Sequence, residues 1–163
     1  MNKICFLLLF IFALQYNQAQ ILSAKNDKLG LEVYTSTFVF ENIYLTDELG
    51  VRISNKIKYR KELQIQLHVS NLDHAVFVDD YARLDGDIAL FNDKQHVLLE
   101  AEDILEDKAF SKFENEGKID LMSYLTIGGQ KMDFNKLYTL YTRFYDKNGK
   151  GYIIILYKFK FVK

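Results

Sequence analysis

The side chains that could carry acid–base or metal chemistry are few and widely spaced. His68, His74 and His96 show no ligand-like spacing, and the chain holds a single Cys, Cys5. Zinc sites need several His or Cys ligands at short intervals, and a nucleophilic serine usually sits in a Gly-x-Ser-x-Gly turn, which the sequence lacks. We therefore predict no catalytic residue, no metal ligand and no cofactor.

A group of acids surrounds Gly86: Asp79, Asp80, Asp85 and Asp87. These carboxylates could offer oxygen atoms to Ca²⁺, and the Asp-Lys-Asn-Gly run at 146–149 resembles half of a calcium loop. Neither stretch supplies the closing bidentate Glu of such a loop, and acids beside glycines are common turn formers. A calcium site and a hydrolase acting through these acids are therefore minor alternatives, and we expect a protein that is not an enzyme.

Charge is nearly balanced overall but unevenly placed. The formal net charge of −1 excludes a dedicated nucleic-acid-binding protein, which would carry a strong basic excess. Residues 73–116 hold thirteen acids and four bases, whereas residues 136–163 hold seven bases and one acid. Lysines on the last strand could protect a sheet edge from aggregation. Alternatively, this segment forms a cationic surface for acidic glycans or lipid head groups, beside Tyr138, Tyr141 and Tyr145.

The first nineteen residues have the pattern of an export signal. Lys3 precedes an unbroken apolar run at 4–14, and Ala19 supplies a small residue before the expected cut. The run would reach only about 16 Å as a helix, roughly half of a bilayer core, so we expect no membrane-spanning segment. We predict a signal peptide at 1–19 and a single domain at 20–163. The protein is then secreted, periplasmic or held at the cell surface.

The remaining residues are typical of an all-β protein. Leu63, Ile65, Leu67 and Val69 alternate with polar residues, which indicates a half-buried strand. Runs rich in aromatic and β-branched residues predict further strands at 31–40, 51–57, 87–91, 96–99, 119–127, 137–145 and 152–162. Turn residues at 92–95 and 146–149 indicate two hairpins.

Two stretches interrupt the strands. Residues 71–84 fit a long crossing loop with a short strand, and residues 103–116 fit a helical turn or two. Long crossings between hairpins are typical of Greek-key sandwiches and argue against an up-and-down barrel. The sequence thus predicts an all-β, Greek-key (immunoglobulin-like) β-sandwich of seven to eight strands with one short helical or irregular insertion.

The last hairpin is unusually apolar on both faces. A four-residue loop at 146–149 would pair Tyr145 with Lys150, and a two-residue loop at 148–149 would shift this pairing by two without exchanging the faces. Strands that are apolar on both faces are usually buried on both. The second face should therefore be covered, either by another part of the chain, by a protein partner or by a second subunit. Its candidate partner-binding residues are Tyr141, Arg143, Tyr152, Ile154 and Leu156.

Two runs carry a resemblance to known proteins. The stretch from Leu137 to Tyr152 resembles the closing hairpin of uncharacterised exported bacterial Ig-like β-sandwich proteins, and the stretch from Asp87 to Glu100 is similar to their internal hairpin. The resemblance implies a fold and an exported location, and it transfers no catalytic residue.

We therefore expect an exported, non-enzymatic binding or protein-interaction module whose partner is an unknown protein or glycan, with a homodimer as an open possibility. The alternative is a lipocalin-like carrier of a small apolar ligand, which would need an interior cavity.

Overall fold

The computed structural model describes residues 21–102, 104–105, 112–114, 118–128 and 132–163. The predicted signal peptide lies outside these residues, as does most of the predicted insertion at 103–116. Of the described residues of that insertion, 104–105 form a turn and Lys112–Glu114 form a strand. Within the described residues there are twelve strands and no helix, which confirms the all-β class, although the predicted number of strands was too low.

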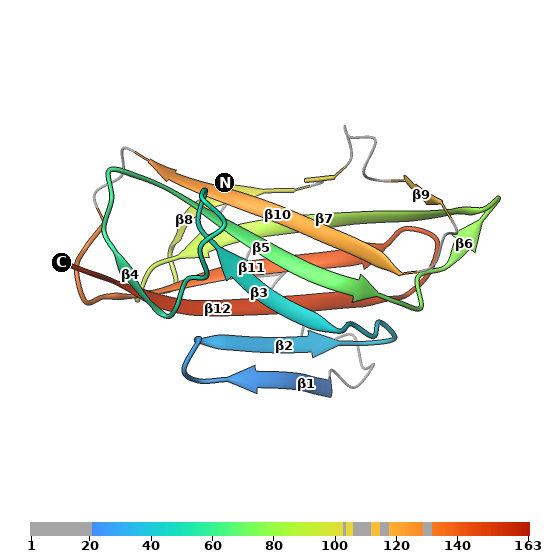
Figure 1. Cartoon of the computed structure of the whole chain (residues 1–163), viewed down its shortest axis with the longest axis horizontal. Helices are drawn as coiled ribbons and strands as arrows, with labels where there is room; N and C mark the ends of the chain where they lie inside the picture. Colours follow the sequence, from blue (N-terminus) through green and yellow to red (C-terminus); the bar gives the residue numbers. More distant parts are fainter. Residues whose placement is uncertain (1–20, 103, 106–111, 115–117, 129–131) are drawn as a thin grey trace.

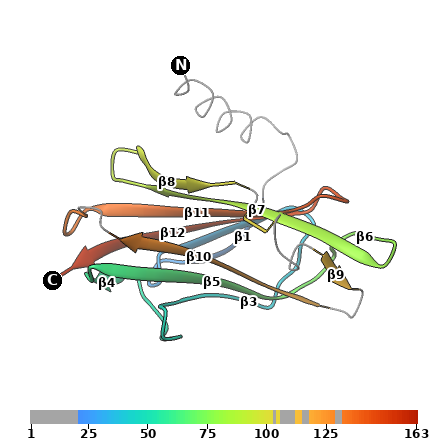
Figure 2. The same cartoon turned by 90° about the horizontal axis from the view of Figure 1, so that it is seen from above.

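The strands fall into a large sheet and a small sheet, arranged as two layers (Figures 1 and 2). In the large sheet the order is β1-β2-β12-β11-β7-β6, with β4 paired to β12 and with β8 and β9 paired to β7. Its strands are β1 (Ile21–Asn26), β2 (Leu31–Thr35), β4 (Lys56–Lys58), β6 (Phe77–Val78), β7 (Tyr81–Phe91), β8 (Val97–Ala101), β9 (Lys112–Glu114), β11 (Leu137–Asp146) and β12 (Tyr152–Val162). In the small sheet the order is β10-β5-β3, formed by β10 (Ile119–Gly128), β5 (Glu62–Leu72) and β3 (Asn42–Thr46). The Greek-key, immunoglobulin-like connectivity stays a prediction.

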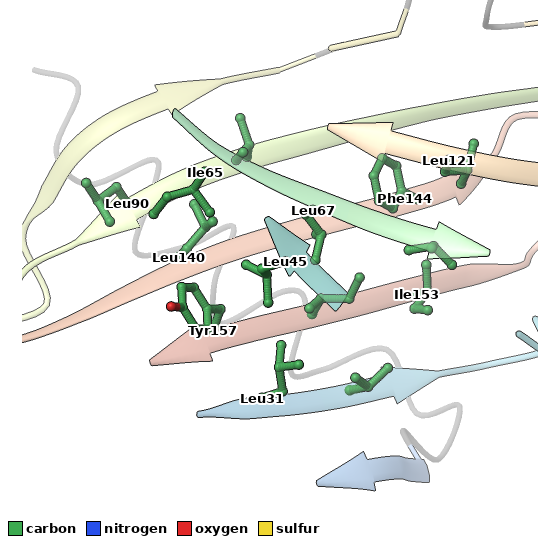
Figure 3. Close-up of a cluster of buried hydrophobic side chains, with 14 of the residues drawn as sticks. Leu31, Leu45, Ile65, Leu67, Leu90, Leu121, Leu140, Phe144, Ile153 and Tyr157 are labelled. Atoms are coloured by element: carbon green, nitrogen blue, oxygen red, sulfur yellow. The ribbon is translucent and has the colours of Figure 1, made fainter. Parts of the chain in front are cut away.

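The hydrophobic core fills the space between the two sheets. Alternate residues of β5 and β10 point inward from the small sheet, as their period-two pattern requires. Phe144 and Tyr157 meet them from the large sheet, and both side chains are almost fully buried. Figure 3 shows these side chains packed between the layers with Ile65, Leu67 and Leu140.

The last hairpin has the predicted faces but a different register. Tyr145 pairs with Tyr152 rather than with Lys150, which is the register of the predicted shift by two. Asp146 extends the ladder because its carboxylate accepts hydrogen bonds from the backbone N–H of Asn148 and of Val76, at 2.8 and 2.7 Å. Val76 lies seventy residues away in the sequence, so the turn depends on a contact that local patterns do not contain.

Strand β7 begins earlier than predicted, at Tyr81 instead of Asp87. Asp79 and Asp80 form the tight turn before it, with positive φ angles of 52° and 65°, as expected of hairpin turns. Gly86 lies inside this strand. A glycine fits there because a Cβ atom would come within 2.6 Å of the Arg143 carbonyl oxygen. The acids around Gly86 are thus strand and turn residues, and they do not form one loop.

The first predicted strands are shorter in the structure. β2 ends at Thr35, and the strand expected at 51–57 is reduced to Lys56–Lys58. Beyond Thr35 the chain turns so that the ring of Phe38 packs at the position where Gly151 would carry a Cβ atom. Burial of Phe38 therefore overrides the local strand preference of residues 36–40. No helix within the described part of the chain is long and apolar enough to cross a membrane.

Candidate functional site

The five residues predicted to bind a partner do share one face of the large sheet. Tyr141 and Arg143 lie on β11, and Tyr152, Ile154 and Leu156 lie on β12, with Arg143 opposite Ile154 and Tyr141 opposite Leu156. This face points away from the core. Ile154 is only 9% exposed and the other four are half-buried. Tyr34 of β2 lies opposite Ile154, and Ala89 of β7 lies opposite Tyr141, so neighbouring strands of the same sheet account for part of this burial.

Arg143 is engaged within the sheet. Its Nε atom donates to the Asp87 carboxylate at 2.8 Å, its Nη2 atom forms an ion pair with the same oxygen, and the guanidinium carbon lies 4.9 Å from the centre of the Tyr145 ring. Burial by itself would lower the pKa of Arg143, but Tyr141 and Asp87 raise it above its usual value. The guanidinium is therefore held as a cation by neighbouring strands, which leaves it less available to a partner.

Asp85 is a fully buried carboxylate at the same end of the sheet. Its Oδ1 atom accepts from the backbone N–H groups of Gly86 and Leu105, and its Oδ2 atom lies 2.6 Å from the Lys147 ammonium. Burial alone would raise the pKa of Asp85, but Lys147 and the two amides outweigh it and lower the pKa. This arrangement satisfies a charge inside the fold and does not expose an acid for catalysis.

Three bases of the segment 136–163 form ion pairs with acids of the segment 73–116. Arg143 pairs with Asp87, Lys147 with Asp85, and Lys136 with Asp93 at 3.2 Å. Tyr138, one of the aromatic residues expected on a cationic surface, points into the core and is 4% exposed. The broad cationic surface predicted for residues 136–163 is therefore not formed as expected.

The acids considered for calcium are dispersed in the same way. Asp85 and Asp87 are committed to Lys147 and Arg143, whereas Asp79 and Asp80 form a turn. Among the residues that the structure describes, no group of three or more His, Cys, Asp or Glu side chains is placed to hold a metal ion.

A different surface, on the outer side of the small sheet, gathers exposed aromatic and polar side chains. We call it the small-sheet face and define it by Tyr44, Arg52, Gln64, Gln66, His68, Met122 and Tyr124. Cross-strand pairing aligns these residues in rows, with Tyr44, His68 and Met122 in one row and Thr46, Gln66 and Tyr124 in the next. Met122 is 51% exposed and Tyr124 is 52% exposed. The rows place large side chains at the surface next to hydrogen-bonding groups.

The aromatic part of the small-sheet face is a three-membered stack. The rings of Tyr44 and His68 are nearly parallel, with centroids 4.6 Å apart, and the Arg52 guanidinium carbon lies 3.6 Å from the centre of the Tyr44 ring. Such stacking restrains flexible side chains at the surface. Burial, and secondarily the charge of Arg52, lowers the pKa of His68, so its imidazole is neutral near pH 7.

The polar part of the small-sheet face is a chain of hydrogen bonds. The Thr46 hydroxyl lies 3.0 Å from His68 Nε2 and donates to Gln66 Oε1 at 3.2 Å. The Gln66 amide then donates to Gln64 Oε1 at 2.7 Å. These contacts orient two amides and one imidazole before any ligand arrives, which reduces the entropy lost on binding.

Sequence reasoning did not identify the small-sheet face. The period-two pattern at 63–69 places His68 on the polar side of its strand, but a pattern within one strand does not show which side chains of β3 and β10 lie beside it. A similar alternation in β10 places Met122 and Tyr124 outward. The missing information was the register between β3, β5 and β10, which joins these separate patterns into one surface.

No protein-family model and no curated protein sequence matches the chain. Among solved structures, a β-galactosidase candidate from Bacteroides fragilis is 14% identical with a TM-score of 0.44, and the match covers 74% of this chain but only 17% of that one. The C-terminal domain of Wzt is 9% identical with a TM-score of 0.49, covering 91% and 81% of the two chains. Chicken MD-1 in complex with lipid IVa is 11% identical with a TM-score of 0.40, covering 86% and 96%. The resemblance to these structures is limited to a β-rich fold.

Proposed function

We propose that this chain is an exported, non-enzymatic binding module that binds carbohydrate on the small-sheet face. The observation that carries the proposal is the exposed ring of Tyr124, which lies directly across the ladder from Gln66. An exposed tyrosine beside pre-oriented amides offers both an apolar surface and hydrogen-bonding groups within one row of the sheet.

The chemistry of the small-sheet face matches that of a sugar ring. A pyranose has C–H groups on its faces, which pack well against an aromatic ring, and hydroxyl groups around its rim. The amides of Gln64 and Gln66 and the imidazole of His68 can each donate and accept hydrogen bonds, as hydroxyl groups require. Arg52 is the one described cation among the residues that define this face, so the best match is a neutral or weakly acidic saccharide.

Glu62 and Asp120, two carboxylates on this side of the small sheet, lie at opposite ends of β5. Glu62 lies opposite Gly128 at one end of β5, whereas Asp120 accepts a hydrogen bond from the backbone N–H of Asn71 at the other end. Glu62 and Asn71 are nine positions apart along β5, roughly 30 Å. Glycosidases hold their two carboxylates within about 10 Å of each other. Glu62 is therefore too far from Asp120 to form such a pair with it. Glu41, at the Asp120 end, accepts a hydrogen bond from the Asn71 side-chain amide.

The two sequence-based alternatives have less support. Docking of a protein on the hairpin face stays a prediction, because Arg143 is committed to Asp87 and Ile154 is already nearly buried. A carrier of a small apolar ligand would need space between the sheets. Phe144, Tyr157 and Phe159 occupy that region with almost no exposure, which favours binding on an outer surface.

Replacing Tyr124 tests the proposal. The exported protein is run by affinity electrophoresis through gels containing each of a panel of neutral and weakly acidic soluble polysaccharides. We expect retardation by at least one of them, and Tyr124→Ala should weaken this binding roughly tenfold because the aromatic contact is lost.

Tyr81→Ala is the matched control, since Tyr81 is also an exposed tyrosine on a strand but belongs to the large sheet. It should bind like the unaltered protein. Equal weakening in the two variants, or no retardation by any polysaccharide, would refute the proposal.

A further inference from the structure

Three lysines lie together on the outer side of the large sheet, near the C-terminal end of β12. Lys160 is directly opposite Lys56 of β4, and Lys58 is opposite Val162. Leu137 of β11 flanks Lys160 on its other side and is 40% exposed. We call this surface the lysine patch: Lys56, Lys58, Lys160, Leu137 and Val162.

The lysines of the patch are not paired with any described acid, unlike Lys158 and Lys25. Lys158 is paired with Glu32 at 3.0 Å, and Lys25 with Asp27 at 3.2 Å. Lys56, Lys58 and Lys160 are exposed, and no described carboxylate lies within 4.0 Å of their ammonium groups. The patch is therefore a local positive surface on a protein whose net charge is close to zero.

Edge protection does not explain this arrangement. Lysines do protect exposed sheet edges, and that explanation fits Lys56 and Lys58, because β4 is an outer strand. It does not fit Lys160, since β12 is flanked by β11 on one side and by β4 on the other at this position. In addition, like charges directly opposite each other weaken a sheet. The Lys56–Lys160 pair thus opposes folding stability, which points to a role other than stability.

We propose that the lysine patch binds the anionic head groups of a lipid bilayer surface. The positive patch complements the negative charge of such a surface. Lysine suits this role because its flexible point charge fits diffuse negative charge, whereas arginine is suited to bidentate recognition of single groups. Leu137 and Val162 lie among the lysines, so they can enter the head-group layer, where an apolar side chain gains from burial. A polysaccharide in water would make less use of these two side chains.

The position of the lysine patch is compatible with this role. It is formed by β4, β11 and β12 of the large sheet, whereas the small-sheet face is formed by β3, β5 and β10 of the other layer together with Arg52 (Figure 2). Docking through the patch would use no residue of the small-sheet face. The proposal does not depend on carbohydrate binding, because it uses other residues on the other sheet.

Flotation with lipid vesicles tests the proposal on the exported protein. We expect binding to vesicles of phosphatidylglycerol and phosphatidylcholine in equal parts, none to pure phosphatidylcholine, and weakening as salt is raised. Each of Lys56→Gln, Lys58→Gln and Lys160→Gln should lower binding about fivefold, and the triple variant about a hundredfold. Leu137→Ala should also weaken binding to the mixed vesicles.

The control is the triple variant Lys94→Gln, Lys118→Gln and Lys150→Gln, which changes net charge equally at exposed lysines outside the patch. It should keep most of the binding. The patch variant should unfold at the same temperature or a higher one, since a like-charge pair is removed. Three results would overturn the proposal: no binding to the mixed vesicles, equal losses in the two triple variants, or full competition by a soluble acidic polysaccharide. Tyr124→Ala should not alter flotation, so this proposal and the carbohydrate proposal can fail separately.

Discussion

At the scale of single residues, Asp85 shows how the fold uses a buried charge. The carboxylate has no exposed surface, yet two backbone amides and the Lys147 ammonium surround it. Its pKa is lowered relative to the unfolded chain, because these donors outweigh the effect of burial. A group with a lowered pKa stabilises the folded state above its unfolded pKa, about 4 for Asp, and loses that contribution as pH falls through the folded value.

We therefore expect acid sensitivity that depends on Asp85. The Asp85→Asn variant should be less stable by about 1–3 kcal/mol near pH 7, because the ion pair with Lys147 is lost. Between about pH 4 and pH 2 its stability should fall less steeply than that of the unaltered protein. Urea unfolding across this pH range measures both effects.

Asp79→Asn provides the comparison for Asp85→Asn. Asp79 is exposed and has a positive φ that asparagine also tolerates, so its stability should change by less than about 0.5 kcal/mol. Identical pH profiles for Asp85→Asn and the unaltered protein would show that Asp85 does not supply the acid-sensitive contribution.

At the scale of elements, β7 connects the parts of the large sheet. It pairs with β11 along Leu84–Phe91, with β8 at one end, and with β6 and β9 at the other. A Cβ atom at Gly86 would come within 2.6 Å of the Arg143 carbonyl oxygen and 2.9 Å of the Phe144 ring on β11. Of the four acids near Gly86, Asp85 and Asp87 belong to this strand, and their charges are met by Lys147, just beyond β11, and by Arg143 on β11.

Adding one methyl group at Gly86 should therefore disturb the β7–β11 pairing. We expect Gly86→Ala to lower the free energy of unfolding by about 1–3 kcal/mol through overpacking. Gly128→Ala is the control, because the nearest atom to its Cβ position, Glu62 Cγ, is 3.5 Å away, an ordinary contact distance. Thermal or urea unfolding compares the two variants. If Gly86→Ala is as stable as the unaltered protein, β7 and β11 accommodate the added methyl group without loss of free energy, which would contradict the prediction.

At the scale of the whole molecule, the two proposed binding surfaces belong to different sheets. The small-sheet face is neutral apart from Arg52 and rich in hydrogen-bonding groups, whereas the lysine patch is positive. The core between the sheets fixes their separation, since its large side chains are almost fully buried. Binding at one surface should leave the other accessible.

Simultaneous binding tests this separation. Protein bound to phosphatidylglycerol vesicles should still bind the polysaccharide identified by electrophoresis, with an affinity unchanged within about twofold, because no residue is shared between the two surfaces. Isothermal titration of polysaccharide into vesicle-bound protein measures this affinity. Competition between the vesicles and the polysaccharide would show that the two surfaces overlap.

The hairpin of β11 and β12 shows how far sequence patterns lead. Period-two alternation predicted which side chains share each face, because it depends only on strand geometry. The register differed by two from the main expectation, since Asp146 is held by the backbone of Val76. In the same way, the outward direction of His68 was predictable, but its stacking on Tyr44 was not, because that contact depends on the pairing of β3 with β5.

The sequence by itself determined the all-β class, the two faces of the last hairpin and the uneven placement of charge, because each follows from local periodicity or composition. Only the tertiary structure decided which charges meet. Pairing of β7 with β11 cancels Arg143 against Asp87 and brings Asp85 close to Lys147, whereas pairing of β12 with β4 places Lys160 opposite Lys56. It also decided that Tyr124 and Gln66 share a row. Interactions across strands depend on register and sheet order, which are set by the packing of the whole core and not by neighbours in sequence.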